Sequence, residues 1–274
     1  MIPTLPDHPM HWDDGQDARH APSPCADPWM ALRRHTPARI SLGRAGTSLP
    51  TPEVLRFAAA HALARDAVHL PLDVDALLAD LHAQGFEATP VASRAGSRAE
   101  YLMRPDRGRQ LSEAGRDALQ ADSAPGLCIV IGDGLSAVAA QAHGAPLAAA
   151  LRDAGVVAAR LVVATQARVA LGDEIGERLG APLVLVLLGE RPGLSSPDSL
   201  GAYLTWAPRV GRADSERNCV SNIRPQGLPL AEAAARIAWL VAQAQRRRVT
   251  GIALKDGSEL LTAPGWPSPA PPAI

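Results

Sequence analysis

Aromatic residues are scarce in this 274-residue chain, at 3% of positions, whereas hydrophobic residues of all kinds make up 47%. The core must therefore be built mainly from Leu, Val, Ile and Ala, and the length allows one large domain or two ordinary ones. The formal net charge is only −1, which argues against binding of nucleic acid or an anionic membrane surface. No apolar run reaches the length of a membrane span, and the N-terminus lacks a signal-peptide pattern.

Cysteine is also scarce. Cys25, Cys128 and Cys219 are odd in number and far apart, which excludes a disulfide framework and a zinc knuckle and suits a reducing cytosol. Four histidines fall within the first 36 residues, but no carboxylate or cysteine at a fixed helical spacing accompanies them. We therefore expect no metal site there and interpret residues 1–36 as a flexible lead-in.

The chain is organised around residues 128–136. A short β-branched run enters the turn Gly132-Asp133-Gly134, and alanine-rich helical sequence follows. Strand, glycine turn and helix form the first half of a βαβ unit. Such a turn favours a polar or anionic ligand, because glycines let N–H groups approach it and the helix start carries a positive dipole end. The motif is incomplete as a dinucleotide fingerprint or a P-loop, so a plain strand-to-helix turn is the alternative.

Strand-like and helix-like segments alternate from residue 127 onward. Strands are predicted at 127–131, 160–164, 183–188, 201–206 and 251–254, and helices at 135–142, 147–153, 169–179 and 230–246. The strand runs are continuously apolar, which predicts that both faces of the sheet are buried.

These patterns predict an α/β fold. We expect a Rossmann-like, doubly wound, mostly parallel sheet over residues 127–256, preceded by a smaller, mainly helical N-terminal domain over 37–121. The Pro-rich tail over 257–274 is predicted to be disordered.

Ligands of open α/β sheets bind beyond the carboxyl ends of the strands. Three segments are expected at that edge, namely 132–134, 166–169 and 189–193. Glu190 leaves the most hydrophobic strand, where its carboxylate can accept a hydrogen bond from a ligand amide, hydroxyl or ring N–H. A surface ion pair with Arg191 is the alternative, but the position favours ligand contact.

The segment 209–225 is long, polar and without periodicity, which predicts a functional or mobile loop. Cys219 lies within it, but no neighbouring histidine and carboxylate would activate its thiol, so we interpret it as a packing surface. The sequence shows no Ser-His-Asp arrangement, no paired carboxylates at one site and no metal spacing. We therefore expect no catalytic residues and no complete active site in this chain.

Seven motifs occur in a fixed order along residues 36–255. They are the segments 36–46, 60–68 and 104–109, Gly-Asp-Gly-Leu-Ser at 132–136, Ala-Arg-Val-Ala at 167–170, Gly-Glu-Arg-Pro-Gly at 189–193 and Cys-Val-Ser-Asn-Ile at 219–223. Together they resemble the small (light) subunit of ethanolamine ammonia-lyase. Several motifs in one order are far more specific than any one of them alone.

The resemblance implies a non-catalytic subunit of an adenosylcobalamin-dependent carbon–nitrogen lyase, which converts ethanolamine to acetaldehyde and ammonia. The chemistry would take place in the barrel of a large subunit, with this chain covering the cofactor's other side in an oligomer of heterodimers. The setting would be the cytoplasm, with a bacterial microcompartment as an alternative.

Matching the motifs implies cobalamin contacts at Val169, Glu190 and Cys219. Weaker candidates are Gly132, Asp133, Gly134 and Arg191.

His82 belongs to the pattern Asp-x-His-x-x-Gly at 80–85, which occurs in proteins that bind cobalamin through a histidine. There the histidine lies in a loop after a buried strand, whereas His82 is expected in the last turn of an amphipathic helix, where His favours the dipole and Gly85 is the C-cap. The family also keeps the cofactor's own benzimidazole on cobalt. We therefore interpret His82 as part of a helix end.

Two other functions stay open at this point. One is a free-standing oxidoreductase that uses a nicotinamide or flavin on the same sheet, against which the third glycine of the fingerprint is missing. The other is a purely structural partner subunit with no corrinoid contact.

Overall fold

The computed structural model describes residues 28–121 and 126–258. The chain divides into two compact units, residues 1–58 and 59–274, which we describe separately. Most of the predicted lead-in over 1–36 and of the Pro-rich tail over 257–274 lies outside the described residues.

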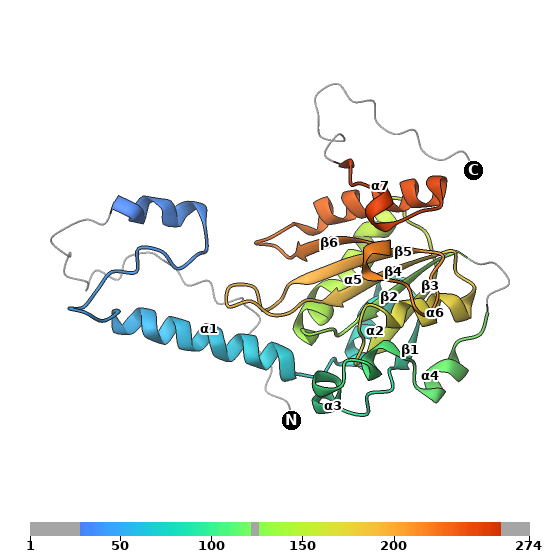
Figure 1. The fold of residues 1–274 in the computed structure, drawn as a ribbon, viewed down its shortest axis with the longest axis horizontal. Coiled ribbons are helices and arrows are strands. Elements are labelled where there is room, and N and C mark those ends of the chain that lie inside the picture. The colour runs from blue at the N-terminus through green and yellow to red at the C-terminus, as the bar shows by residue number, and fades with distance from the viewer. Residues whose placement is uncertain (1–27, 122–125, 259–274) are drawn as a thin grey trace, which may run out of the picture. The chain divides into compact units, whose positions relative to one another are not determined.

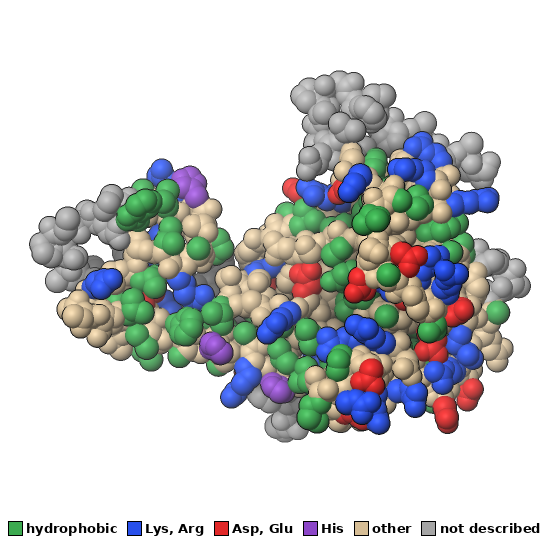
Figure 2. All heavy atoms as spheres, viewed as in Figure 1, with side chains coloured by type: hydrophobic (Ala, Val, Ile, Leu, Met, Phe, Trp, Pro, Cys, Tyr) green, Lys and Arg blue, Asp and Glu red, His purple; other side chains and the backbone are tan. Residues whose placement is uncertain are grey.

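The first unit contains the 3₁₀ helix η1 (Pro28–His35) and the start of helix α1 (Thr51–His69). Helix α1 is apolar over much of its surface without burying it. Leu55 is 64% exposed, and Val54 and Phe57 are exposed as well. Figure 2 shows hydrophobic side chains along this helix. Exposed apolar side chains grouped in this way are typical of a contact surface.

Helix α2 (Val74–Ala83) lies in the second unit. The Asp73 side chain accepts a hydrogen bond from the Ala76 N–H at 3.0 Å and caps the helix. Gly85 follows the helix end with a φ of +79°, as a C-terminal glycine should. His82 lies in the last turn, exposed and 3.6 Å from Glu87. The predicted helix end is confirmed.

One mixed sheet of six strands forms the centre of the second unit, in the order β1-β3-β2-β4-β5-β6 (Figure 1). The strands are β1 (Ala88–Ala92), β2 (Leu127–Gly132), β3 (Ala158–Thr165), β4 (Leu183–Gly189), β5 (Leu200–Trp206) and β6 (Arg217–Ile223). The first four in that order pair in parallel, and β5 and β6 are added antiparallel. The predicted α/β fold with a mostly parallel sheet is confirmed. A separate, mainly helical N-terminal domain is not, because β1 pairs with β3 in this sheet.

Both faces of the central strands are buried, as their continuous apolar runs predicted. Ile129 and Ile131 on β2 belong to a core cluster that includes α2, α5 (Ala137–Asp153) and α7 (Leu230–Arg247). Cys128 and Val130 on the same strand point into a second cluster, which includes α6 (Leu171–Leu179). Shorter elements complete the described chain, namely α3 (Arg98–Met103), η2 (Arg107–Arg109), α4 (Glu113–Ala118), η3 (Asp214–Glu216) and η4 (Gly251–Ala253).

Three predictions about elements are wrong. Residues 137–153 form one helix that continues through Pro146 rather than two pieces. Residues 251–253 form the 3₁₀ helix η4 rather than a strand. The segment 209–225 is not one long loop, because it contains η3 and the strand β6.

Strand β6 has no apolar periodicity because it is the edge strand of the sheet and buries an arginine. Arg217 donates to Asp173 on α6 through Nη1 at 2.6 Å and Nη2 at 2.7 Å. The Thr205 hydroxyl and the Arg212 carbonyl each accept from it at 3.0 Å. A polar strand is stable here because its buried charge is paired and hydrogen-bonded.

The turn after β2 is tied to the turn after β3 by one buried carboxylate. Asp133 Oδ1 accepts from the Ala167 N–H at 2.9 Å, and Oδ2 accepts from the Gln166 N–H at 2.8 Å and from Arg98 Nη1 at 3.2 Å. Burial raises the pKa of Asp133, and these hydrogen bonds and the Arg98 charge act in the opposite direction. Gly134 completes the turn with a φ of +52°, so close to β4 that a Cβ would lie 2.1 Å from the Gly189 carbonyl oxygen.

We expect Asp133→Asn to lower the free energy of unfolding by about 2–3 kcal/mol, because an amide NH₂ would face a donor in place of one acceptor. Denaturant unfolding measures this change, with the exposed Asp117→Asn as the matched control. A loss no larger than that of the control would contradict the structural role assigned to Asp133.

Candidate functional site

A cavity of about 660 Å³ opens at the carboxyl edge of the sheet. Residues that follow β3 and β4 line it, together with Tyr101 of α3, Arg109 of η2 and Tyr203 of β5. This is the edge at which α/β sheets bind ligands.

The cavity brings together some of the predicted site residues. Val169, Glu190 and Arg191 all line it, although they come from two separate turns. Cys219 is not part of the lining, but it lies on β6 directly opposite Tyr203, which is.

Gly132, Asp133 and Gly134 do not line the cavity but are buried beside it. Both Asp133 oxygens are occupied by protein donors. The glycines here allow close packing, since a Cβ on Gly132 would lie 2.8 Å from the Leu188 side chain.

The Glu190 carboxylate is held by one of its two oxygens. Oε2 accepts from the Ser199 hydroxyl at 2.5 Å and from the Asn222 N–H at 3.1 Å. Gly201 leaves room for the carboxylate, because a Cβ there would lie 2.8 Å from Oε1. Oε1 accepts no hydrogen bond from any residue that the structure describes. The site therefore offers one oriented, open acceptor.

Cys219 and Tyr203 lie directly opposite each other on β6 and β5. Desolvation, followed by the nearby charge of Glu190, raises the pKa of the Cys219 thiol. The pKa of Tyr203 is raised as well, chiefly by burial. Both groups stay protonated at neutral pH, which disfavours nucleophilic chemistry at Cys219.

Tyr101 is fully buried and contacts two guanidinium groups. Arg98 lies 4.8 Å and Arg168 4.4 Å from the ring centroid, within the range of a cation–π interaction. The Tyr101 hydroxyl donates to the Ala167 carbonyl at 2.9 Å. Tyr101 therefore fixes the turn that carries Arg168 and Val169 at the edge of the cavity.

Cationic side chains outnumber acidic ones in the cavity lining. Arg109, Arg168, Arg191 and Arg212 face Glu190 and Asp214. Arg212 is paired with Glu216, and Asp214 lies 3.5 Å from Arg217 Nε. The other three arginines have no carboxylate partner among the described residues. The cavity is therefore suited to a polar ligand that carries negative charge.

Sequence reasoning placed residues 166–169 at this edge and identified 104–109 as a matching motif, but it did not bring Arg109 and Arg168 to one cavity. It also missed Tyr101 and Tyr203. The chain has only two tyrosines, and both line this cavity. The scarcity of tyrosine in the sequence was the one feature that could have identified these two residues as candidates for the site.

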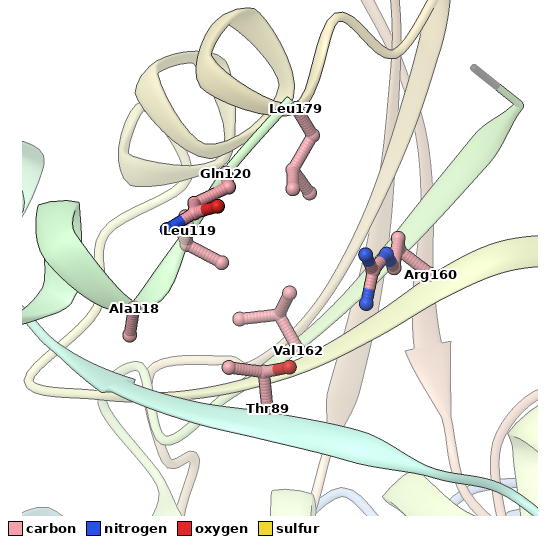
Figure 3. Close-up of a pocket in the computed structure, with 7 residues that line it drawn as sticks. All are labelled: Thr89, Ala118, Leu119, Gln120, Arg160, Val162 and Leu179. Carbon is pink, nitrogen blue, oxygen red and sulfur yellow. The ribbon is translucent and has the colours of Figure 1, made fainter. Parts of the chain in front are cut away.

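A second cavity of about 250 Å³ lies elsewhere on the same sheet. Figure 3 shows Thr89 of β1 with Arg160 and Val162 of β3 on one side, and Leu119 and Leu179 on the other. None of the predicted site residues lines it. We therefore take the larger cavity as the candidate site.

Residues 28–121 and 126–258 contain no group of three or more His, Cys, Asp or Glu side chains that could hold a metal ion. They also contain no helix that is both long and apolar enough to span a bilayer.

The chain is similar to known proteins over most of its length. Residues 26–255 match the family described as ethanolamine ammonia-lyase light chain (EutC). Three curated relatives carry the name ethanolamine ammonia-lyase small subunit. They come from Ralstonia nicotianae (53% identical, covering 85% of this chain and 90% of the relative), Rhodopseudomonas palustris (53%, 89% and 99%) and Bradyrhizobium diazoefficiens (55%, 84% and 91%). The chain belongs to the ethanolamine ammonia-lyase light chain family.

Proposed function

We propose that this chain is the non-catalytic small subunit of an adenosylcobalamin-dependent ethanolamine ammonia-lyase and that it holds the cofactor at the carboxyl edge of its sheet. The observation that carries this proposal is that Val169 and Glu190, matched to cobalamin contacts through two separate motifs, line one cavity. Residues 127–256 would then be the Rossmann-like, doubly wound cobalamin-contacting domain. The parallel strands β2, β3 and β4, with helices packed on each face, support that description.

The residues of the cavity fit the periphery of the cofactor. Cobalamin presents amide groups, hydroxyls and a phosphate, and the cavity offers the open Glu190 oxygen, unpaired arginines and tyrosine surfaces. Its volume of about 660 Å³ accommodates part of so large a ligand, which leaves the remainder for a second subunit. When bound, the cofactor supplies the radical chemistry through its cobalt–carbon bond. The residues of this chain would bind and orient it.

A larger, barrel-type catalytic subunit would be the partner, in an oligomer of heterodimers. The name small subunit in the relatives supports a larger partner. The exposed apolar surface of α1, including Leu55 and Phe57, supports a protein contact in this chain.

An oxidoreductase that places a dinucleotide on the turn after β2 is disfavoured. Such a turn needs free N–H groups and open backbone, but Gly134 packs against the Gly189 carbonyl and Asp133 is bonded on both oxygens. A purely structural subunit is disfavoured by the open acceptor of Glu190.

The isolated chain should not convert ethanolamine, because the radical chemistry is assigned to the bound cofactor in the large subunit and the cavity residues of this chain only bind and orient the cofactor. Mixing it with the large subunit and adenosylcobalamin should restore turnover, measured as acetaldehyde release. Acetaldehyde formation by this chain and the cofactor alone would refute the assignment of a non-catalytic role.

Glu190→Gln should weaken cobalamin affinity about ten- to a hundredfold, because a charge-assisted hydrogen bond contributes roughly 1.5–3 kcal/mol. The rate at saturating cofactor should change much less. Titration of adenosylcobalamin against the reconstituted complex measures both quantities. The exposed Glu232→Gln on α7 is the matched control. Unchanged affinity with a collapsed saturated rate would show that Glu190 serves catalysis or assembly instead.

A further inference from the structure

We propose that Arg168 and Arg109, together with the backbone N–H groups of Val169 and Ala170, form a binding site for a phosphate group within the cavity. The proposal rests on the proposed function, because the phosphate that we assign to this site is the phosphodiester of bound adenosylcobalamin. All four residues line the same cavity.

Arg168 is fixed in place but lacks an acceptor. Its backbone N–H donates to the Gly108 carbonyl at 2.8 Å, and its guanidinium stacks 4.4 Å from the centroid of the Tyr101 ring. Its Nε is buried and has no hydrogen-bond partner in the described structure. No other hydrogen bond or ion pair of this side chain is present in the described structure, and the residue lines the cavity, so its guanidinium is available to an acceptor on a ligand there.

Arg109 lies at the same cavity as Arg168 because the residue before it, Gly108, is hydrogen-bonded to the Arg168 backbone. The bond from the Arg168 N–H to the Gly108 carbonyl ties η2 to the turn after β3. Gly108 is packed so closely that a Cβ would lie 2.9 Å from the Tyr101 ring. The Arg109 guanidinium itself is exposed and contacts no acceptor among the described residues. The hydrogen bond between residues 108 and 168 therefore holds two arginines near each other. Two guanidinium groups can each donate hydrogen bonds to the oxygens of one phosphate.

The backbone adds two further donors at the start of α6. The N–H groups of Leu171, Gly172 and Asp173 turn back to the carbonyls of residues 168–170, at 2.9, 3.0 and 3.2 Å. Within the described chain, the N–H groups of Val169 and Ala170 donate to no acceptor. Free N–H groups at a helix start are suited to an anion.

The nearby acidic groups are already committed to other partners. Asp173 is bonded to Arg217, and Glu174 accepts from Arg116 Nε and from the Leu111 N–H, each at 2.7 Å. The two acidic residues of the cavity lining, Glu190 and Asp214, lie near Ser199 and Arg217. No carboxylate of the described chain therefore neutralises Arg168 or Arg109, and their two positive charges favour an anionic ligand group.

Adenosylcobalamin carries a phosphodiester in the chain that links its corrin ring to its nucleotide base. The same phosphate chemistry could come from free phosphate. The two sources differ in one respect, because only the cofactor's phosphodiester makes corrinoid affinity depend on Arg168.

The test uses the reconstituted complex with the large subunit and follows the absorbance change of the corrin on binding, which does not require turnover. Arg168→Met keeps a long, flexible side chain beside Tyr101 but removes the charged guanidinium. It should weaken binding of adenosylcobalamin and adenosylcobinamide phosphate about ten- to a hundredfold and leave phosphate-free adenosylcobinamide unaffected. Arg109→Met, at an exposed position, should give a smaller loss with the same selectivity.

The matched control is Arg178→Met, which removes one positive charge from the other end of α6 and should change no corrinoid affinity. An equal loss for all three corrinoids, or no loss, would overturn the phosphate site. Inorganic phosphate should compete with adenosylcobalamin but not with adenosylcobinamide. Phosphate that binds the complex without weakening adenosylcobalamin would overturn the link to the cofactor. A wild-type complex that binds no corrinoid would instead overturn the proposed function.

Discussion

The buried carboxylate of Asp133 is the constraint on which the candidate site depends. It joins the turn after β2 to the backbone of the turn after β3, and Arg98 extends the link to α3. Arg98 also lies over the Tyr101 ring, as does Arg168. One desolvated charge thus fixes three segments that are distant in sequence. The desolvation of that charge is unfavourable, but its hydrogen bonds to backbone and guanidinium donors offset much of the cost.

The opposite wall of the cavity is held by a second set of contacts. The loop between β4 and β5 is bonded at several points: the Ser136 hydroxyl donates to the Pro197 carbonyl at 2.7 Å, and Arg224 donates to the Ser195 carbonyl at 2.7 Å. These bonds keep Ser199 in position to hold Glu190. Both sides of the cavity are therefore tied to neighbouring segments by hydrogen bonds. Such support from surrounding residues favours precise positioning of a ligand.

Sequence reasoning predicted the central sheet well because strands that are buried on both faces must be continuously apolar, as in residues 183–188. It failed at β6, because this polar edge strand is stabilised by a buried ion pair between Arg217 and Asp173. These residues are far apart in the sequence, so no local pattern predicts their pairing. For the site, Glu190 and Val169 could be placed from their positions after strands and from the resemblance. Tyr101 and Arg109 could not, because their role depends on contacts with the turn after β3.

The groups that the cavity can offer to a ligand depend on which of its side chains are already protonated or paired within the chain. Thiol and phenol are protonated at Cys219 and Tyr203, and the buried carboxylates are paired, so the groups that remain available are one oxygen of Glu190 and several cationic or N–H donors. A surface of this kind holds polar ligand groups through a few oriented acceptors and donors, so the cavity is built to bind and orient a ligand rather than to attack it with a thiolate or phenolate.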